Sequence, residues 1–189
     1  MTRFLLISAL LFIISGCSSP KNLIPKDHVR FVIGNPLMTY EARLSFGTFV
    51  DGDFREDTFS KPTYTFTEDK RYIVGHAKRG SVIGVTSVAA NDASGNYLGT
   101  FTPCQKTLVF QLPSGNSATY ITELNYEWKN VVIYPRYQER FEQAKSYFIN
   151  NSESGVEELS QGSYYQLYAD LYHGCRKPSG HPYALWRPY

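Results

Sequence analysis

Most of the short motifs that identify an enzyme are missing from this chain of 189 residues. It contains no Gly-x-Ser-x-Gly segment, which excludes the common nucleophile elbow of serine hydrolases. It contains neither a glycine-rich phosphate loop nor a His-Glu-x-x-His segment, which excludes P-loop nucleotide binding and the usual zinc-protease site. We therefore expect no metal, no cofactor and no catalytic residue of these types.

The chain has little net charge and few cysteines. The chain has 19 Lys and Arg side chains and 17 Asp and Glu side chains, which gives a net charge of +2. This near-neutral charge argues against a nucleic-acid partner, which would favour a clustered basic face. The chain has three cysteines and no Cys-x-x-Cys pair, so a zinc site of that kind is excluded. No segment beyond residue 20 is apolar for long enough to cross a membrane as a helix.

The chain does have one long apolar run, and it lies at the start. Arg3 is followed by an apolar run over residues 4–14, and two small residues separate this run from Cys17. The layout is typical of a secretory signal and is too short for a transmembrane helix. The alternatives are a signal peptide with an incidental cysteine and a buried apolar helix.

The ending Ile14-Ser15-Gly16-Cys17 resembles the lipobox of bacterial lipoproteins. The resemblance implies that residues 1–16 are a signal peptide and that Cys17 is lipidated after cleavage. It also implies that three acyl chains hold the protein stably in a Gram-negative membrane. Ser18 stands where lipoproteins kept at the inner membrane often have Asp. The resemblance therefore implies the outer membrane, with the domain facing the periplasm, ahead of the inner membrane.

Cys104 and Cys175 remain once Cys17 carries lipid. In an oxidising compartment an even pair of cysteines predicts a disulfide. Such a bridge closes a loop of about 70 residues and contributes on the order of 4 kcal/mol in the chain-entropy model. A catalytic or metal-binding cysteine is the alternative, because His173 lies two residues before Cys175.

Residues 17–27 have the composition of a lipidated, proline-punctuated tether, and residues 28–189 that of a single β-rich domain with an irregular C-terminal tail. The chain has 15 Tyr and 12 Phe, which suit strands. The clearest hairpin turns at Asp51-Gly52. Residues 75–80 are expected to form an exposed loop. Strands are predicted at residues 28–33, 40–50, 54–59, 63–66, 71–74, 81–89, 97–101, 107–112, 117–124 and 131–134.

One amphipathic helix is predicted late in the chain. Its apolar residues recur at helical spacing and form a stripe suited to covering a sheet. Pro135 lies upstream of this stripe, and Asn150-Asn151 is expected to end the helix. The stripe consists of Tyr137, Phe141, Ala144 and Phe148.

Residues 163–172 fit both a strand and a helix, and their tyrosines favour a strand. The predicted fold is mainly β: an antiparallel β-sandwich or open barrel with one covering α-helix in the C-terminal half. Residues 108–148 also resemble small bacterial lipoproteins of unknown function that carry a transthyretin- or PEGA-like sandwich. That resemblance rests on the Pro113-Ser114-Gly115 turn, an aromatic strand ending near Tyr126 and a helix over residues 141–148.

Ionisable side chains form no obvious catalytic set. His76, Lys78 and Arg79 make a small basic cluster that suits contact with lipid phosphates or lipopolysaccharide. A solvated loop is the preferred interpretation, because three charges fall short of a polybasic signal. The histidines are scattered and are expected to be surface or loop residues. They are His28, His76, His173 and His181.

The preferred functional hypothesis is a non-enzymatic, lipid-anchored envelope protein whose β domain binds another protein in the periplasm, since exposed sheet edges dock partner strands. One alternative is an envelope hydrolase with a site among His76, Cys104 and His173. Another is a purely structural or lysis-type lipoprotein. The aromatic tail suits either a partner or glycan contact or the cover of a sheet edge. Its large rings are Tyr183, Trp186 and Tyr189.

Overall fold

The fold comes from a computed structural model of the chain, which describes residues 24–37, 39–92, 94–102, 106–115, 117–129, 132–151, 156 and 158–170. Two curled β-sheets account for most of these residues, and one helix lies in the C-terminal half. The predicted fold class is therefore confirmed. The elements in chain order are β1 (His28–Gly34), β2 (Tyr40–Val50), β3 (Asp53–Glu56), β4 (Thr63–Phe66), β5 (Tyr72–Lys78), β6 (Val82–Asn91), β7 (Tyr97–Phe101), β8 (Lys106–Gln111), β9 (Ala118–Lys129), β10 (Val132–Gln138), α1 (Phe141–Asn150), β11 (Leu159–Gln161) and β12 (Tyr165–Asp170).

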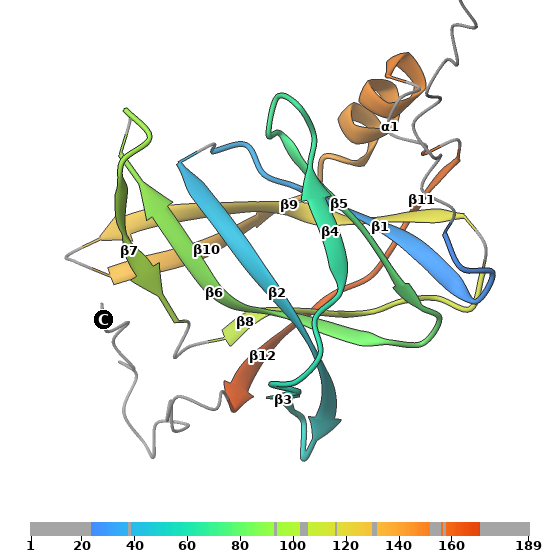
Figure 1. The fold of residues 1–189 in the computed structure, drawn as a ribbon, viewed down its shortest axis with the longest axis horizontal. Helices are drawn as coiled ribbons and strands as arrows, with labels where there is room; N and C mark the ends of the chain where they lie inside the picture. Colours follow the sequence, from blue (N-terminus) through green and yellow to red (C-terminus); the bar gives the residue numbers. More distant parts are fainter. Residues whose placement is uncertain are drawn as a thin grey trace, which may run out of the picture.

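The first sheet has the strand order β10-β9-β1-β5-β4, with β11 also beside β9 (Figure 1). Strand β1 runs antiparallel to β5 and parallel to β9. Strand β9 serves two neighbours on its other edge: residues 118–120 pair with β11, and residues 123–129 pair with β10. Because the chain leaves this sheet after β10 and returns to it at β11, the intervening helix α1 stays against the same sheet.

The second sheet closes on itself. Its pairings run β2-β3-β12-β8-β6, β6 pairs back to β2, and β7 extends from the other edge of β6. The closed part is narrow, and the fully buried side chains of Phe54 and Val109 pack together there. Glycine makes room for this ring, because a Cβ on Gly84 would lie 2.7 Å from the ring of Phe54.

The main core lies between the two sheets. Phe31 from the first sheet meets Phe110 from the second, with ring centroids 5.4 Å apart. Period-two alternation supplies these side chains: Leu108, Phe110 and Leu112 are all buried in this core. In β9 the alternation shifts by one residue, because Ile121 and Leu124 both face this core.

Helix α1 covers the opposite face of the first sheet. Ala144 and Phe148 are buried there, and the ring of Phe148 lies 5.1 Å from that of Tyr72. The expectation that Tyr137 belongs to the helical stripe is wrong: it lies in β10, as does Pro135. Proline is tolerated there because, among the described strands, β10 pairs with β9 alone and so forms a sheet edge.

Two further expectations change. Residues 75–78 are not part of a loop, because β5 continues to Lys78, and the turn is confined to Arg79 and Gly80. Gly75 lets the ring of Phe31 cross the strand, because a Cβ there would lie 2.8 Å from Phe31 Cε1. The ambiguous residues 163–172 contain strand β12, as favoured from their tyrosines. The short strand β11 was not predicted.

Candidate functional site

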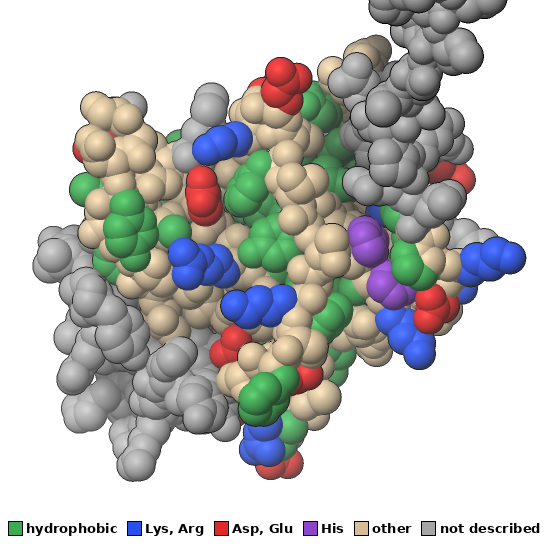
Figure 2. All heavy atoms as spheres, in the orientation of Figure 1, with side chains coloured by type: hydrophobic (Ala, Val, Ile, Leu, Met, Phe, Trp, Pro, Cys, Tyr) green, Lys and Arg blue, Asp and Glu red, His purple; other side chains and the backbone are tan. Residues whose placement is uncertain are grey.

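Two histidines distant in sequence meet on the outer face of the first sheet. His28 begins β1 and His76 lies in β5, with their Nδ1 atoms 3.0 Å apart and their ring centroids 5.2 Å apart. The register pairs His28 with Lys78 and Arg30 with His76, so these four side chains share one face. Figure 2 shows the two histidines (purple) side by side at the surface, with Lys and Arg side chains near them.

Strand alternation explains why these residues converge. Val29 and Ala77 are buried in the domain interior, so their neighbours along the two strands point outward. Further along the same outer face, Val32 and Tyr72 lie under α1. The outer face of the first sheet is thus divided into an apolar half beneath the helix and a basic half beside it.

The histidine pair shares one hydrogen bond. Burial lowers the pKa of His76, and the nearby His28 and Arg30 lower it further. In the Nδ1–Nδ1 contact one ring donates and the other accepts. Nε2 of His28 lies 4.0 Å from Oδ1 of Asp27.

A pocket of about 490 Å³ opens beside this pair, and we call it the basic pocket. Its walls come from the segment that leads into β1, from β1 itself, from the β5–β6 turn and from the start of β9. The backbone N–H of Arg79 donates to the carbonyl of Asp27 over 2.9 Å, which holds the turn against the lead-in segment. The pocket is lined by Ile24, Pro25, Lys26, His28, Arg30, Arg79, Ser117, Ala118, Val156 and Glu158.

The described lining of the basic pocket carries charges of both signs. Lys26, Arg30 and Arg79 are cationic and Glu158 is anionic, while Ala118 provides an apolar wall. Nε of Arg79 donates to the carbonyl of Gly115 at 3.4 Å. In the part of the chain that the structure describes, no group of three or more His, Cys, Asp or Glu side chains is placed to hold a metal ion.

A second pocket, of about 430 Å³, is polar and lies over β2, β3, β6 and β7. Ser45 and Thr86 share a buried hydrogen bond of 3.0 Å at its wall. Arg43, Lys61 and Glu56 bring charges of both signs. Among the described residues that line it there is no histidine and no cysteine.

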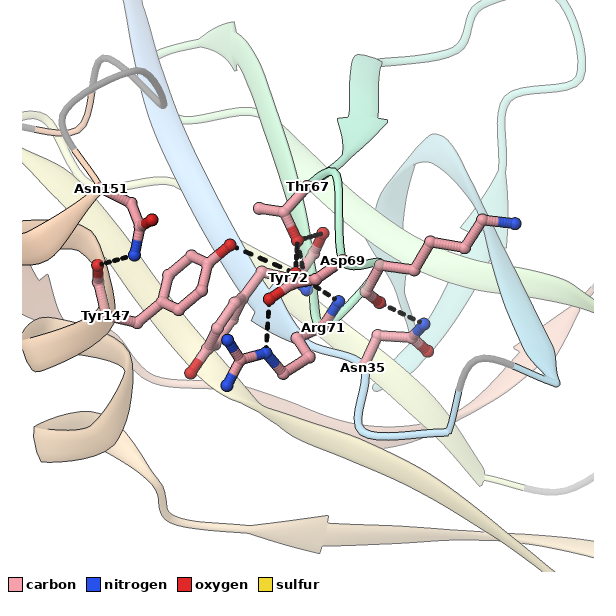
Figure 3. Close-up of polar contacts among 8 residues, drawn as sticks. Asn35, Thr67, Asp69, Arg71, Tyr72, Tyr147 and Asn151 are labelled. Carbon is pink, nitrogen blue, oxygen red and sulfur yellow. Dashed lines mark hydrogen bonds and ion pairs between the residues drawn. The ribbon is translucent and has the colours of Figure 1, made fainter.

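A polar cluster at the β4–β5 turn has a structural role. Asp69 accepts hydrogen bonds from Thr67 Oγ1 at 2.8 Å, from the backbone N–H and Nε of Arg71, and from the hydroxyl of Tyr147 in α1 (Figure 3). The Arg71 guanidinium also lies over the Tyr147 ring, 4.8 Å from its centroid. Burial opposes ionisation, but these donors outweigh it and lower the pKa of Asp69 to about 2.

The structure reaches few of the residues singled out from sequence. Cys17, Cys104, Cys175, His173 and His181 all lie outside the described residues. The anchor, the disulfide and the cysteine–histidine alternative therefore remain predictions. The aromatic tail residues Tyr183, Trp186 and Tyr189 lie outside the described residues as well.

The sequence does not predict the contact between His28 and His76, because the strand predicted at residues 71–74 ends before His76. A signal was present: Ile73, Gly75 and Ala77 continue the inward-facing series of β5. Extending the strand over them places His76 on the opposite face. Its partner strand could not be identified, because register between distant strands is not encoded in either segment alone.

Comparison with known proteins adds no relative. No protein-family model matches the chain, no curated protein is significantly similar to it in sequence, and no solved structure is significantly similar to its fold.

Proposed function

We propose that this chain is a lipid-anchored bacterial envelope protein, held in the outer membrane through Cys17, whose β domain binds a partner protein in the periplasm and catalyses no reaction. The lipobox-like ending at Cys17 supports the anchor. The described domain starts at Ile24, seven positions later. A tether of that length keeps the domain close to the membrane surface, because an extended chain spans at most roughly 3.3–3.6 Å per residue.

The observation that carries the binding role is the exposed edge strand β7. Among the described strands it pairs with β6 alone. Tyr97 and Leu98 at its start are 63% and 62% exposed. An unpaired strand edge flanked by exposed apolar side chains is a docking site for another strand. Figure 1 places β7 on the opposite side of the domain from the start of β1, which keeps a partner clear of the anchor.

Site-specific photo-crosslinking in intact envelopes tests the binding role. A photoreactive residue at Leu98 should give a discrete adduct with one partner protein, identified by mass spectrometry. The matched control carries the same group at Glu142, on the exposed surface of α1. Absence of an adduct at Leu98, or the same adducts at both positions, would count against partner binding through β7.

Mass spectrometry of the mature N-terminus tests the anchor separately. We expect an acylated Cys17 as the first residue, after removal of residues 1–16. An unmodified Cys17 with the apolar leader still attached would overturn the anchor, whatever the crosslinking shows.

We also propose the Cys104–Cys175 disulfide, since an even pair of cysteines in the periplasm favours oxidation. Thiol labelling of the folded protein from oxidising cells should leave both residues unlabelled until a reductant is added. Free labelling of both would contradict the bridge.

A further inference from the structure

The second pocket lies at one end of the closed part of the second sheet, and we call it the hydroxyl pocket. Gly47 and Gly84 face the buried ring of Phe54, because a Cβ at these positions would lie 2.4 Å and 2.7 Å from it. Ser45 and Thr86 lie two residues from these glycines along β2 and β6, so strand alternation places them on the same face. The mouth of a closed sheet is a frequent place for a small-molecule site, and the volume of about 430 Å³ is typical of one.

A β-bulge shapes the wall of the hydroxyl pocket. The register of β2 and β6 shifts beside Arg43, which pairs with Ser87, so that Thr86 is the extra residue in β6. Val85 and Val88 both face the main core. The two residues between them, Thr86 and Ser87, therefore both line the pocket, whereas strict alternation would turn one of them away. Bulges often re-aim side chains in this way next to functional sites.

The buried hydroxyls leave hydrogen-bonding capacity for a ligand. Ser45 and Thr86 are 2% and 7% exposed, and their hydroxyl oxygens lie 3.0 Å apart. Their shared bond uses one of the two hydroxyl hydrogens, and the other has no acceptor among the described residues. Ser87 and Thr102 add two further hydroxyls to the lining. A hydroxyl both donates and accepts, which matches a ligand whose own groups do both, as those of a sugar do.

Charged side chains lie at both ends of this row of hydroxyls. Glu56 pairs with Gly47, four residues after Arg43, so roughly 13 Å of strand separates the two charged positions. Ser45 lies midway between them, and Lys61 brings a second cation to the lining. The side chains of Arg43 and Lys61 form no ion pair with a described residue. Both are therefore available to a carboxylate on the ligand.

We propose that the hydroxyl pocket binds a sugar acid, a saccharide that carries a carboxylate. Arg43 and Lys61 bind the carboxylate, and the hydroxyls of Ser45 and Thr86 bond to the hydroxyls of the sugar. Glu56 accepts hydrogen bonds from the opposite end of the ligand and repels its carboxylate, which fixes one orientation. The site does not rest on the docking role of β7 or on the anchor.

Binding is measured by NMR on the mature, full-length protein in an uncharged polyoxyethylene detergent, because a sugar-based detergent would compete. The amide signals of Thr86 and Ser87 are followed during titration with D-glucuronate, D-glucose or acetate up to about 100 mM, which detects millimolar dissociation constants. Glucuronate should shift both signals and bind about fivefold more tightly than glucose, which lacks the carboxylate. Acetate, which lacks the hydroxyls, should bind at least about tenfold more weakly than glucuronate. The amide of Ser117, at the basic pocket, should not shift.

Four variants assign the two parts of the ligand to their side chains. Arg43→Gln and Lys61→Gln should each weaken glucuronate binding about threefold to fivefold and leave glucose binding unchanged within about twofold. Damage to the fold would weaken both sugars. Thr86→Val should weaken both about fivefold, because it removes a hydroxyl that either sugar uses. Lys145→Gln is the control, since it removes the same charge as Lys61→Gln from the exposed surface of α1.

The proposal is overturned if glucuronate shifts neither amide, if acetate shifts them at the same concentrations, or if glucose binds as tightly as glucuronate. It is equally overturned if Lys145→Gln weakens glucuronate binding as much as Lys61→Gln. A negative result here would leave an acylated Cys17 and a Leu98 adduct standing. Conversely, glucuronate binding would stand if Cys17 proved unmodified and Leu98 gave no adduct.

Discussion

The hydroxyl of Tyr147 in α1 donates a hydrogen bond to Oδ1 of Asp69 in the β4–β5 turn, 3.2 Å away and 78 residues earlier in the chain. The ring of Tyr147 also packs on Tyr72, with centroids 4.7 Å apart. The helix is therefore fixed at its C-terminal half by one turn of the sheet that it covers. Asn151 adds a local cap, donating from Nδ2 to the carbonyl of Tyr147 at 2.8 Å.

Removing the Tyr147 hydroxyl tests how much its hydrogen bond to Asp69 contributes to holding α1 against the sheet. Tyr147→Phe keeps the ring contacts and removes the donor to Asp69, so we expect the free energy of unfolding in urea to fall by about 1 kcal/mol. Tyr97→Phe is the matched control, because its hydroxyl bonds to Thr100 at an exposed position. It should change stability by less than about 0.5 kcal/mol. Equal losses in both variants would contradict a special role for Tyr147.

Acid should weaken the same attachment. The pKa of Asp69 is about 2 in the folded protein, below its usual value of 3.8. Its contribution is therefore fully present above about pH 4 and is lost as the pH falls toward 2. Because the side chain is 34% exposed, solvent screening reduces this contribution to roughly 1 kcal/mol. Urea unfolding should be measured at pH 5 and at pH 2.5. The free energy of unfolding should fall less between these two pH values in Asp69→Asn than in the exposed control Glu142→Gln.

The narrow end of the second sheet should not tolerate a side chain at position 84. Gly84→Ala places a methyl group 2.7 Å from the ring of Phe54, so we expect a loss of about 1–3 kcal/mol in unfolding free energy. Combining it with Phe54→Leu should cost less than the sum of the two single changes. Gly115→Ala is the control, since no heavy atom lies within 4 Å of its added Cβ. Strict additivity would contradict the contact.

The histidine pair should make stability fall with mild acid. The pKa of His76 is lowered from 6.5, so the folded protein resists a proton that the unfolded chain takes up. The contribution is present above about pH 6.5 and is lost as the pH falls through the lowered pKa. Arg30 and His28 face the ring from β1, and Asp27 lies beyond His28. NMR titration should show the pKa of His76 below 6.5, and higher in His28→Gln, where the neighbouring imidazole that lowers it is absent. A wild-type value at or above 6.5 would contradict the arrangement.

Replacing the buried Tyr126 with phenylalanine should not weaken the fold. The Tyr126 hydroxyl is buried and has no hydrogen-bond partner among the described residues, and burial together with Tyr137 raises its pKa. Tyr126→Phe should leave stability unchanged or raise it by up to about 1 kcal/mol, because no bond is lost and a desolvated hydroxyl is removed. Tyr64→Phe is the comparison, since its hydroxyl accepts from the Leu44 N–H at 3.4 Å. A large loss in Tyr126→Phe would indicate a missed partner.

The strands were predictable from sequence wherever short-range signals agreed. The alternation over Tyr40–Val50 predicted the observed bounds of β2. The turn at Asp51-Gly52 was predictable because both of its residues adopt positive φ, which these residue types tolerate. The helix was predicted in type but not at its start: Tyr137 fits a helical stripe, yet pairing with Leu124 places it in a strand. Local spacing was outweighed there by hydrogen bonds to a strand that precedes it.

The amino-acid sequence by itself determined which segments alternate, where the hairpin turns and which residues are apolar enough to form a core, because those properties depend on neighbours a few residues apart. The tertiary structure alone decided that His28 meets His76, that Arg30 and Arg79 face one pocket, and that Phe54 occupies the space left by Gly84. These contacts depend on strand register and sheet closure. Both are set by the summed packing of distant segments, which no single segment encodes.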